Sequence, residues 1–219
     1  MEETIKIFIY IHAFFGGLGL ITGLGSIIVK KGSKPHKVMG KLFSIGMITS
    51  SLIIIPISWM PNHKSILLFL IGLFTIYLVI SGNQILTFKL KSKKAAKPID
   101  KIISGSMLSL SILMILFGAY GMMKVNDLNY LLFIFFGGFG LLVTIKDFIF
   151  YKNFVKGKNE WLRNHVGKMI GAFIASVTAF LVAGLGIWNI FAWTLPTLLG
   201  TVYILYWKRK LKPKMVVKQ

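Results

Sequence analysis

Residues 169–207 read MIGAFIASVTAFLVAGLGIWNIFAWTLPTLLGTVYILYW and contain no charged side chain. A run of this kind is typical of segments that are buried in a lipid bilayer. A single helix of this length would rise about 58 Å at roughly 1.5 Å per residue, nearly twice the bilayer's hydrocarbon thickness of about 30 Å. The chain is therefore expected to turn within GIWNIFAW (186–193), with Trp188 and Trp193 at the membrane surface.

The composition of the whole chain indicates the same class. Of 219 residues, 55% are hydrophobic and only six are acidic, which is typical of a membrane protein. The chain has no cysteine, so disulfides, zinc-thiolate sites and iron-sulfur clusters are excluded. Any metal or cofactor would have to be held by histidine, carboxylate, methionine or backbone groups.

Seven runs with few or no charges are each long enough to cross a bilayer. Helix is the expected form, because an isolated apolar strand would leave its backbone unpaired in lipid. We predict an all-α membrane protein in which residues 1–207 form one transmembrane domain of three tandem helical hairpins plus a closing helix, followed by a basic tail at 208–219. The expected spans are residues 5–29, 38–58, 65–88, 102–123, 128–150, 166–187 and 190–207.

The lysines and arginines predict the orientation of these spans. With seven spans, 23 of the 26 cations fall on one side, and only Lys6, Lys64 and Lys124 fall on the other. Cytoplasmic loops are enriched in such residues, so the N-terminus is expected outside and the C-terminus in the cytoplasm. The expected location is a bacterial inner membrane. The net charge of +20 is concentrated beside the membrane, which predicts contact with anionic lipid head groups and no nucleic-acid partner.

Two segments suggest an internal repeat. HAFFGGLGLIT (12–22) resembles FIFFGGFGLLVT (133–144), with Phe133 where the first copy has His12. Each is followed by a basic loop and then by a segment with histidine, lysine, methionine and glycine: GSKPHKVMGKLFSIG (32–46) and EWLRNHVGKMIGAFIA (160–175). KPIDKIISGSM (97–107) is a weaker third copy, in which Asp100 stands in place of His36 and His165.

Helical spacing places several of these residues on packing faces. Small residues allow membrane helices to approach closely, so a stripe that contains them is expected to face protein. We therefore predict that His12 is buried and bonded against a neighbouring helix, and that Phe133 takes the corresponding place in the fifth span. The two stripes are His12, Gly16, Gly19, Gly23 and Ser26, and Phe133, Gly137, Gly140, Thr144 and Asp147.

Ionisable groups on inward faces of membrane helices are candidates for function. His36, His165, Asp100 and Asp147, together with Asn83 and Gln84, are expected near the cytoplasmic side. We predict that His36, His165 and Asp147 approach one another there. The alternative is that these residues have structural roles. His36 and His165 would then lie at the membrane surface, Asp147 would neutralise Lys168 or Lys152, and His12 would bond to a backbone carbonyl. No dedicated metal site is predicted.

Two resemblances extend these observations. The first helix with KKGSKPHKVMGK (30–41) and RNHVGKMIGAFIASVTAF (163–180) resembles predicted bacterial multi-pass membrane proteins assigned to a domain of unknown function. HKVMGK and NHVGKM are similar to elements of ascorbate-reducible transmembrane b-type cytochromes, in which four histidines hold two haems. That resemblance implies that His36 and His165 match the ligands of the cytoplasmic-side haem and His12 one ligand of the outer haem. Phe133 stands at the fourth position and cannot bind iron.

Two functions remain open from the sequence. The first is a membrane redox protein that binds haem b through His36 and His165 and passes single electrons. The alternative is a small-molecule or proton-coupled transporter with a polar path lined by His12, Asn83, Gln84 and Asp147, with Asp100 nearby.

Overall fold

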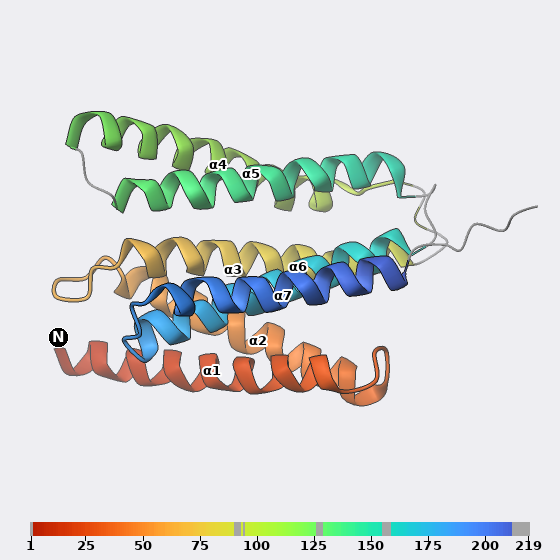
Figure 1. Ribbon diagram of the computed structural model, residues 1–219, viewed down its shortest axis with the longest axis horizontal. Coiled ribbons are helices and arrows are strands. Elements are labelled where there is room, and N and C mark those ends of the chain that lie inside the picture. Colours follow the sequence, from red (N-terminus) through yellow and green to blue (C-terminus); the bar gives the residue numbers. More distant parts are fainter. Residues whose placement is uncertain (1, 90–92, 94, 126–128, 155–158, 212–219) are drawn as a thin grey trace, which may run out of the picture.

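A computed structural model describes residues 2–89, 93, 95–125, 129–154 and 159–211. All regular secondary structure in these residues is helical, and seven helices are long and apolar enough to cross a membrane. The helices run roughly along the long axis of the molecule (Figure 1). They are α1 (Glu2–Ile28), α2 (Lys34–Ile57), α3 (Ile66–Gln84) with the 3₁₀ turn η1 (Ile85–Lys89), α4 (Pro98–Val125), α5 (Asn129–Asn153), α6 (Glu160–Ala179) with the π-helical turn η2 (Phe180–Gly184), and α7 (Ile190–Lys210).

Three helices begin four or more residues before the apolar runs that predict them. The runs were expected to start at residues 38, 102 and 166, whereas α2, α4 and α6 start at Lys34, Pro98 and Glu160. Hydropathy misses these first turns because their residues are polar. In α2 the turn is nevertheless stabilised by Ser33, whose Oγ accepts a hydrogen bond from the His36 backbone N–H at 3.3 Å. Helix thus extends to candidate site residues that lie outside the predicted spans.

The predicted turn in the long uncharged stretch is confirmed. η2 ends at Gly184, and the chain reverses through Gly186, whose φ of +67° is a conformation that glycine adopts without strain. Asn189 then caps α7, because its side-chain oxygen accepts a hydrogen bond from the Ala192 N–H at 3.0 Å. Residues 169–207 therefore belong to two antiparallel helices and not to one.

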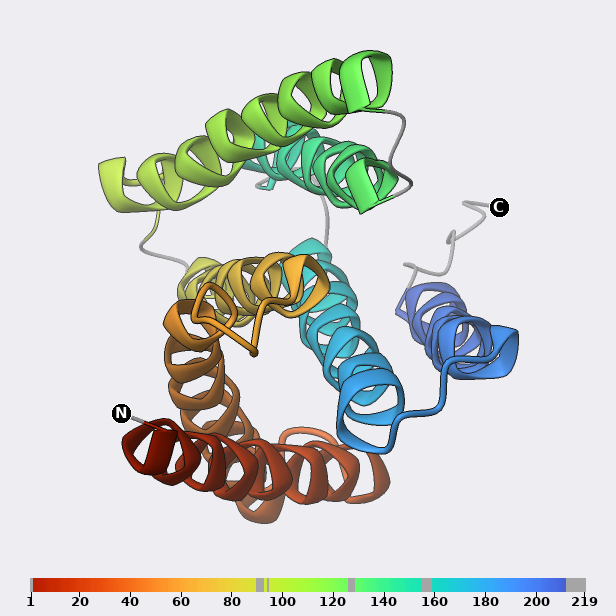
Figure 2. The same ribbon diagram turned by 90° about the vertical axis from the view of Figure 1, so that its left-hand side faces the viewer.

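Four of the helices surround a common core. Viewed along the bundle, α1, α2, α3 and α6 form a four-sided group, with α7 beside α6 and the α4–α5 pair beyond α3 (Figure 2). Phe43 and Met47 of α2 meet Phe173 and Ser176 of α6 inside this group: the two phenyl rings are 6.2 Å apart, and the Ser176 hydroxyl lies 3.0 Å from the Met47 sulfur. We refer to these helices as the four-helix core.

The two ends of the bundle differ in charge. α1, η1, α5 and α7 end, and α2, α4 and α6 begin, at the same end of the bundle (Figure 1), and many of the lysines and arginines of the chain stand in or next to these helix termini in the sequence. We call this the basic end. The N-terminal end holds the start of α1 and the turns after α2 and after η2.

Glycines allow the closest helix pairs to form. A Cβ at Gly46 of α2 would lie 2.7 Å from the Phe15 carbonyl oxygen and 2.9 Å from the Gly19 nitrogen, so the backbones of α1 and α2 touch. A Cβ at Gly137 of α5 would lie 2.8 Å from the Ser111 carbonyl oxygen of α4. The prediction that both glycine stripes face protein is confirmed.

The partner of the second stripe differs from the predicted hairpin. The prediction of three tandem hairpins pairs the fifth span with the sixth, that is α5 with α6. Instead Gly137 and Gly140 of α5 face Ser111 and Met107 of α4, and Phe133 packs against Phe117 of α4 with ring centroids 5.0 Å apart. α6 packs against α3. Similar stripes thus face different neighbours, because glycine spacing specifies a close approach and not its direction.

The contact between α1 and α2 can be tested with Gly46→Ala. The added methyl would meet backbone atoms, which cannot move aside as a side chain can, so we expect a loss of about 1–3 kcal/mol in the free energy of unfolding. Denaturation of the purified protein in detergent measures the change. Gly17→Ala on α1 is the matched control, because a Cβ there meets nothing within 4 Å and alanine favours helix. Equal stability of the two variants would contradict the close packing.

Candidate functional site

His36 lies in the first turn of α2 at the basic end, and its ring contacts α1. Its Nδ1 atom is 3.0 Å from the backbone oxygen of Ser26. A carbonyl oxygen only accepts hydrogen bonds, so Nδ1 carries the proton and donates it. When a ring bonded in this way is neutral, Nε2 has the lone pair.

His165 on α6 makes the same kind of contact with α3. Its Nδ1 is 2.8 Å from the backbone oxygen of Gly82 and donates to it. A Cβ at Gly82 would lie 2.8 Å from the Met169 sulfur and 3.2 Å from the Lys168 Cβ, so glycine is what permits α3 and α6 to approach here. His165 thus presents an Nε2 lone pair as well.

Both imidazoles lie toward the basic end of the bundle, because α2 and α6 both begin there (Figure 1). One turn beyond His36 on α2, a Cβ built at Gly40 would meet nothing within 4 Å. Asn83 of α3 donates from Nδ2 to the Ser44 hydroxyl of α2 at 2.9 Å. We call His36, Gly40, Asn83 and His165 the histidine site.

The histidine site is bounded by aromatic side chains. One turn deeper along α1 and α2, a Cβ at Gly23 would lie 2.7 Å from the Phe173 ring and 2.8 Å from the Phe43 ring. Lys31, in the connection between α1 and α2, donates to the Ser26 carbonyl oxygen at 2.7 Å and lies over the Tyr203 and Trp207 rings of α7. Burial lowers the pKa of Lys31 below its ordinary value. The site therefore has an apolar inner boundary and a cation near its edge.

His12 is bonded to α2, as the sequence predicted. Its Nδ1 lies 2.9 Å from the Ser50 carbonyl oxygen and 2.8 Å from the Ser50 hydroxyl, which in turn donates to the His12 carbonyl oxygen at 3.1 Å. The residue is half-buried and not fully buried. It stands more than three helical turns from His36 along α2, since Ser50 and His36 are 14 residues apart. His12 therefore lies outside the histidine site.

A second polar group is buried where α3, α4, α5 and α6 meet. Asp147 and Lys168 form an ion pair at 2.7 Å, and their side chains are 2% and 5% exposed. The Tyr77 and Ser104 hydroxyls each donate to the same Asp147 oxygen at 2.7 Å. Lys168 also donates to the Tyr77 and Ser81 hydroxyls at 3.0 Å. Every helix of this junction thus supplies a hydrogen-bonding side chain.

Hydrogen bonds continue from this ion pair toward the basic end. The Ser104 hydroxyl lies 2.8 Å from the Tyr151 hydroxyl, which donates to the Asp100 carbonyl oxygen at 3.1 Å. The Asp100 carboxylate accepts from Gln84 Nε2 at 2.9 Å and pairs with Lys93 at 2.9 Å. We call the whole set the ion-pair network: Tyr77, Ser81, Gln84, Lys93, Asp100, Ser104, Asp147, Tyr151 and Lys168.

The residues that the sequence analysis grouped fall into different hydrogen-bonded sets. Asp147 was predicted to approach His36 and His165. Its hydrogen-bond and ion-pair partners in the described residues are Lys168, Tyr77 and Ser104, and none of them is a histidine. The alternative in which Asp147 neutralises Lys168 is confirmed. Of the residues expected to line one polar path, Gln84, Asp100 and Asp147 lie in the ion-pair network, whereas Asn83 and His12 bond to α2.

Tyr77, Ser81, Ser104 and Tyr151 were missed from the sequence. Serine and tyrosine occur on many packing faces of membrane helices, so no periodic signal distinguished them. The spacing of Asp100 and Ser104, one turn apart on α4, could have indicated that Ser104 lies on the same face as a buried carboxylate. Which helix would face it could not be read from that spacing.

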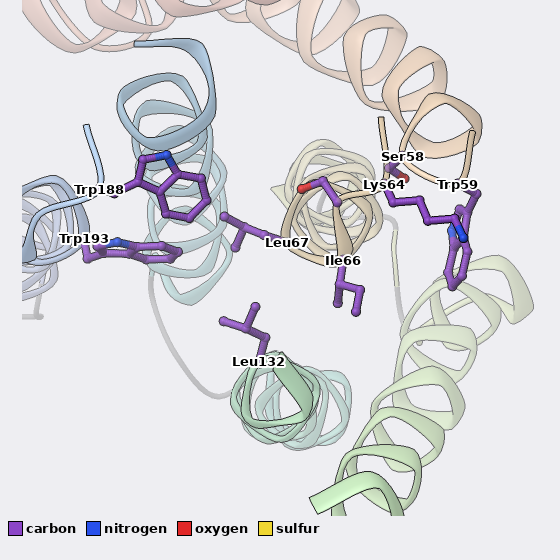
Figure 3. A pocket seen from close by; sticks show the side chains of 9 residues that line it. Ser58, Trp59, Lys64, Ile66, Leu67, Leu132, Trp188 and Trp193 are labelled. Atoms are coloured by element: carbon purple, nitrogen blue, oxygen red, sulfur yellow. The ribbon is translucent and has the colours of Figure 1, made fainter. Parts of the chain in front are cut away.

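A hollow of about 430 Å³ lies at the N-terminal end, away from both polar groups. In Figure 3, Trp188 and Trp193 stand on one side, Leu67 and Leu132 lie at its middle, and Lys64 and Trp59 stand on the other side. Its lining comes from the turns after α2 and η2 and from the ends of α3 and α5. Because its lining is mainly apolar and aromatic, it offers no catalytic or metal-binding set.

No family model, curated protein or solved structure matched this chain in the comparisons with known proteins. In the described residues, no group of three or more histidine and acidic side chains could hold a metal ion. Function must therefore be argued from the chemistry of the histidine site and of the ion-pair network.

The energetic role of the network can be measured through Asp147→Asn. The substitution removes the negative charge and leaves the buried Lys168 ammonium without a counterion, so we expect the free energy of unfolding to fall by about 3–5 kcal/mol. The double variant Asp147→Asn/Lys168→Met removes both charges and should recover much of that loss. Denaturation in detergent, followed by circular dichroism, provides the measurement.

The matched control for this experiment is Glu160→Gln. It breaks the more exposed pair of Glu160 with Arg163, for which we expect a change of no more than about 1 kcal/mol. If Asp147→Asn cost no more than Glu160→Gln, the ion-pair network would not be holding the helices together.

Proposed function

We propose that this chain is a multi-pass protein of the bacterial inner membrane. It binds haem b between His36 and His165 and passes single electrons at the cytoplasmic face of the membrane. Haem b held by two imidazoles supplies one-electron redox chemistry. The chain's own residues hold the group, set the orientation of the two rings and limit the access of water.

The hydrogen bonds of the two imidazoles carry the proposal. Each ring donates from Nδ1 to a backbone carbonyl, His36 to Ser26 and His165 to Gly82. Histidines that bind a metal almost always donate their other ring N–H in this way, which fixes the tautomer and leaves the Nε2 lone pair for the metal. The donor set is therefore of the chemical type that haem iron requires.

The surroundings of the rings support the same ligand. A Cβ at Gly40, one turn from His36 on α2, would meet nothing within 4 Å, and the Phe43 and Phe173 rings lie about two helical turns from the two histidines. A planar, mostly apolar group needs such a partly apolar site, with few polar groups to fix its orientation. The Lys31 ammonium donates to the Ser26 and Ile27 carbonyl oxygens and has one N–H bond left at the polar edge, where the propionate groups of haem would need partners.

A single haem is proposed. His12 also donates from Nδ1 to a carbonyl, that of Ser50, but it is a lone histidine at its level of the bundle. Phe133, which stands at the remaining ligand position of the resemblance, packs against Phe117 on α4. His12 is then a structural residue of the α1–α2 contact.

The orientation completes the proposal. The cation clusters support a cytoplasmic position for the basic end, and with it for the histidine site, next to anionic lipid head groups. The N-terminus is then outside. Electrons would enter or leave the haem from the cytoplasmic face.

Purified protein expressed with a haem supply is expected to show a Soret band that changes on reduction. His36→Ala and His165→Ala should each abolish or strongly shift this band, because each removes one of the two proposed ligands. Absorbance spectra of the oxidised and reduced protein make the measurement. His63→Ala is the control, because this histidine lies in the turn after α2 at the N-terminal end and should leave the spectrum unchanged. A colourless wild-type protein after haem loading would refute the proposed function.

The proposed orientation is tested with reporters fused to each terminus. A reporter after Gln219 should report the cytoplasm and one before Met1 the outside, because 23 of 26 cations then lie on the cytoplasmic side. Pairs of reporters active in only one compartment, such as a fluorescent protein and a secreted phosphatase, distinguish the outcomes. Both termini on the same side would rule out seven spans.

A further inference from the structure

The hollow at the N-terminal end of the bundle has an apolar floor between α3 and α5. Leu67 of α3 and Leu132 of α5 lie at its middle (Figure 3). One turn farther along α5, the Phe136 ring meets the Phe74 ring of α3 with centroids 6.1 Å apart, so contact between the two helices closes the hollow toward the bundle interior. Its volume of about 430 Å³ lies in the range of about 300–1,000 Å³ that is typical of small-molecule sites. We call it the tryptophan hollow.

Three of the chain's five tryptophans line the tryptophan hollow. Trp188 and Trp193 stand on one side, with ring centroids 6.4 Å apart. Trp59 stands on the other side and packs edge-on against Phe69 of α3 at 5.2 Å. Tryptophan is enriched where membrane helices reach the lipid head groups. A hollow at the ends of helices that are long and apolar enough to cross a membrane lies at the level expected for those head groups.

A hydrogen-bonded turn holds Trp59 and Lys64 beside the hollow. The Ser65 backbone N–H donates to the Ser58 carbonyl oxygen at 3.0 Å, which closes the turn between α2 and α3. Within the turn, the Trp59 N–H donates to the Pro56 carbonyl oxygen at 3.2 Å. The ammonium group of Lys64 is therefore carried to the edge of the hollow by a backbone of fixed shape.

Most polar side chains of the lining can only donate hydrogen bonds. The Lys64 ammonium and the three indole N–H groups are donors without acceptor capacity. The two serines are already bonded: Ser58 donates to the Ile55 carbonyl oxygen at 2.7 Å, and Ser65 accepts from the Leu68 N–H at 3.3 Å. A ligand of the hollow therefore has to bring acceptor oxygens.

The charge of the lining is positive. Among the described residues, no carboxylate lines the hollow, and the ion pairs formed there involve Lys93, Arg163 and Lys168 but not Lys64. A ligand with a negative charge would supply the counterion that Lys64 lacks in this part of the chain. The lining thus favours an anion at one edge and an apolar group over the floor.

We propose that the tryptophan hollow binds one anionic phospholipid, with its phosphate at Lys64 and an acyl chain over Leu67 and Leu132. The phosphate brings both the acceptor oxygens and the negative charge, and the acyl chain covers the apolar floor. The lipid comes from the leaflet at the N-terminal end of the bundle, opposite to the histidine site. Binding there does not depend on haem.

The tryptophans of the hollow provide a local probe of this lipid. Bromine atoms on an acyl chain quench the fluorescence of an indole that they contact. In the variant Trp161→Phe/Trp207→Phe, all three remaining tryptophans line the hollow. The purified full chain with these two changes is titrated in detergent micelles with brominated phosphatidylglycerol, which carries a negative charge. Brominated phosphatidylcholine, which has no net charge, is the comparison.

We expect quenching by phosphatidylglycerol to saturate at one lipid per chain, and quenching by phosphatidylcholine to rise in proportion to its fraction in the micelle. Lys64→Gln should weaken the binding of phosphatidylglycerol about fivefold, the loss expected for one lysine beside a membrane phosphate. Lys6→Gln is the matched control, because it removes a cation from the same end of the bundle, on α1 and outside the hollow. Equal saturation by the two lipids, or an unchanged affinity of Lys64→Gln, overturns the proposal.

The position of the acyl chain is tested on α5. Leu132→Phe enlarges a side chain of the floor and should weaken the binding of phosphatidylglycerol several-fold. Leu131→Phe is its control, because the neighbouring Leu131 is 52% exposed and does not line the hollow. If both variants bound the lipid as tightly as the parent chain, no acyl chain would lie over the floor and the proposal would fail.

Competition separates a lipid from a free phosphate ion. Inorganic phosphate should relieve the quenching no more than sodium chloride of the same ionic strength, because it has no acyl chain to bind the floor. Relief by phosphate beyond that of sodium chloride would assign the site to the free ion and overturn its assignment to a phospholipid.

Discussion

The ion pair between Asp147 and Lys168 determines how the α4–α5 pair is attached to the rest of the bundle. A buried charge cannot be hydrated inside a lipid bilayer, so the Asp147 carboxylate and the Lys168 ammonium are stable there only as a pair. The hydroxyl groups around them likewise need hydrogen-bond partners within the protein. Tyr77, Ser104 and Asp147 come from three different helices, and their bonds are satisfied only when those helices meet in one arrangement. Apolar contacts such as that between Phe74 and Phe136 tolerate sliding, whereas this junction does not.

Buried polar groups need hydrogen-bond partners, and the same requirement explains the Nδ1 hydrogen bonds of the histidines. Backbone carbonyls that face a neighbouring helix accept one more hydrogen bond, and His36, His165 and His12 each supply it from Nδ1. The tautomer of each ring is therefore a consequence of helix packing. A structural bond at one nitrogen leaves the other with a lone pair, which is how a packing residue acquires the capacity to bind a metal.

Close helix contacts set where these groups can lie. α1 and α2 touch through Gly19 and Gly46, which brings Ser26 within reach of His36. At Gly82, the approach of α3 to α6 brings the carbonyl to His165, while the adjacent Ser81 reaches Lys168. The histidine site and the ion-pair network thus share one turn of α3 and one turn of α6. A change in the distance between α3 and α6 would alter the hydrogen bonds of both the histidine site and the ion-pair network.

The amino-acid sequence alone was sufficient to predict the number of helices, the turn near Gly186 and the inward direction of the glycine stripes. These features depend on local properties: the length of apolar runs, the conformational freedom of glycine and the helical repeat. His12 could be assigned to a packing face for the same reason. What the tertiary structure decided is which faces meet. Asp147 lies on the predicted inward stripe of α5, but only the placement of α6 against α3 makes Lys168 its partner and leaves the histidines to backbone carbonyls. Pairing between helices far apart in sequence depends on the combined fit of side chains on several of them, and no local pattern contains that information.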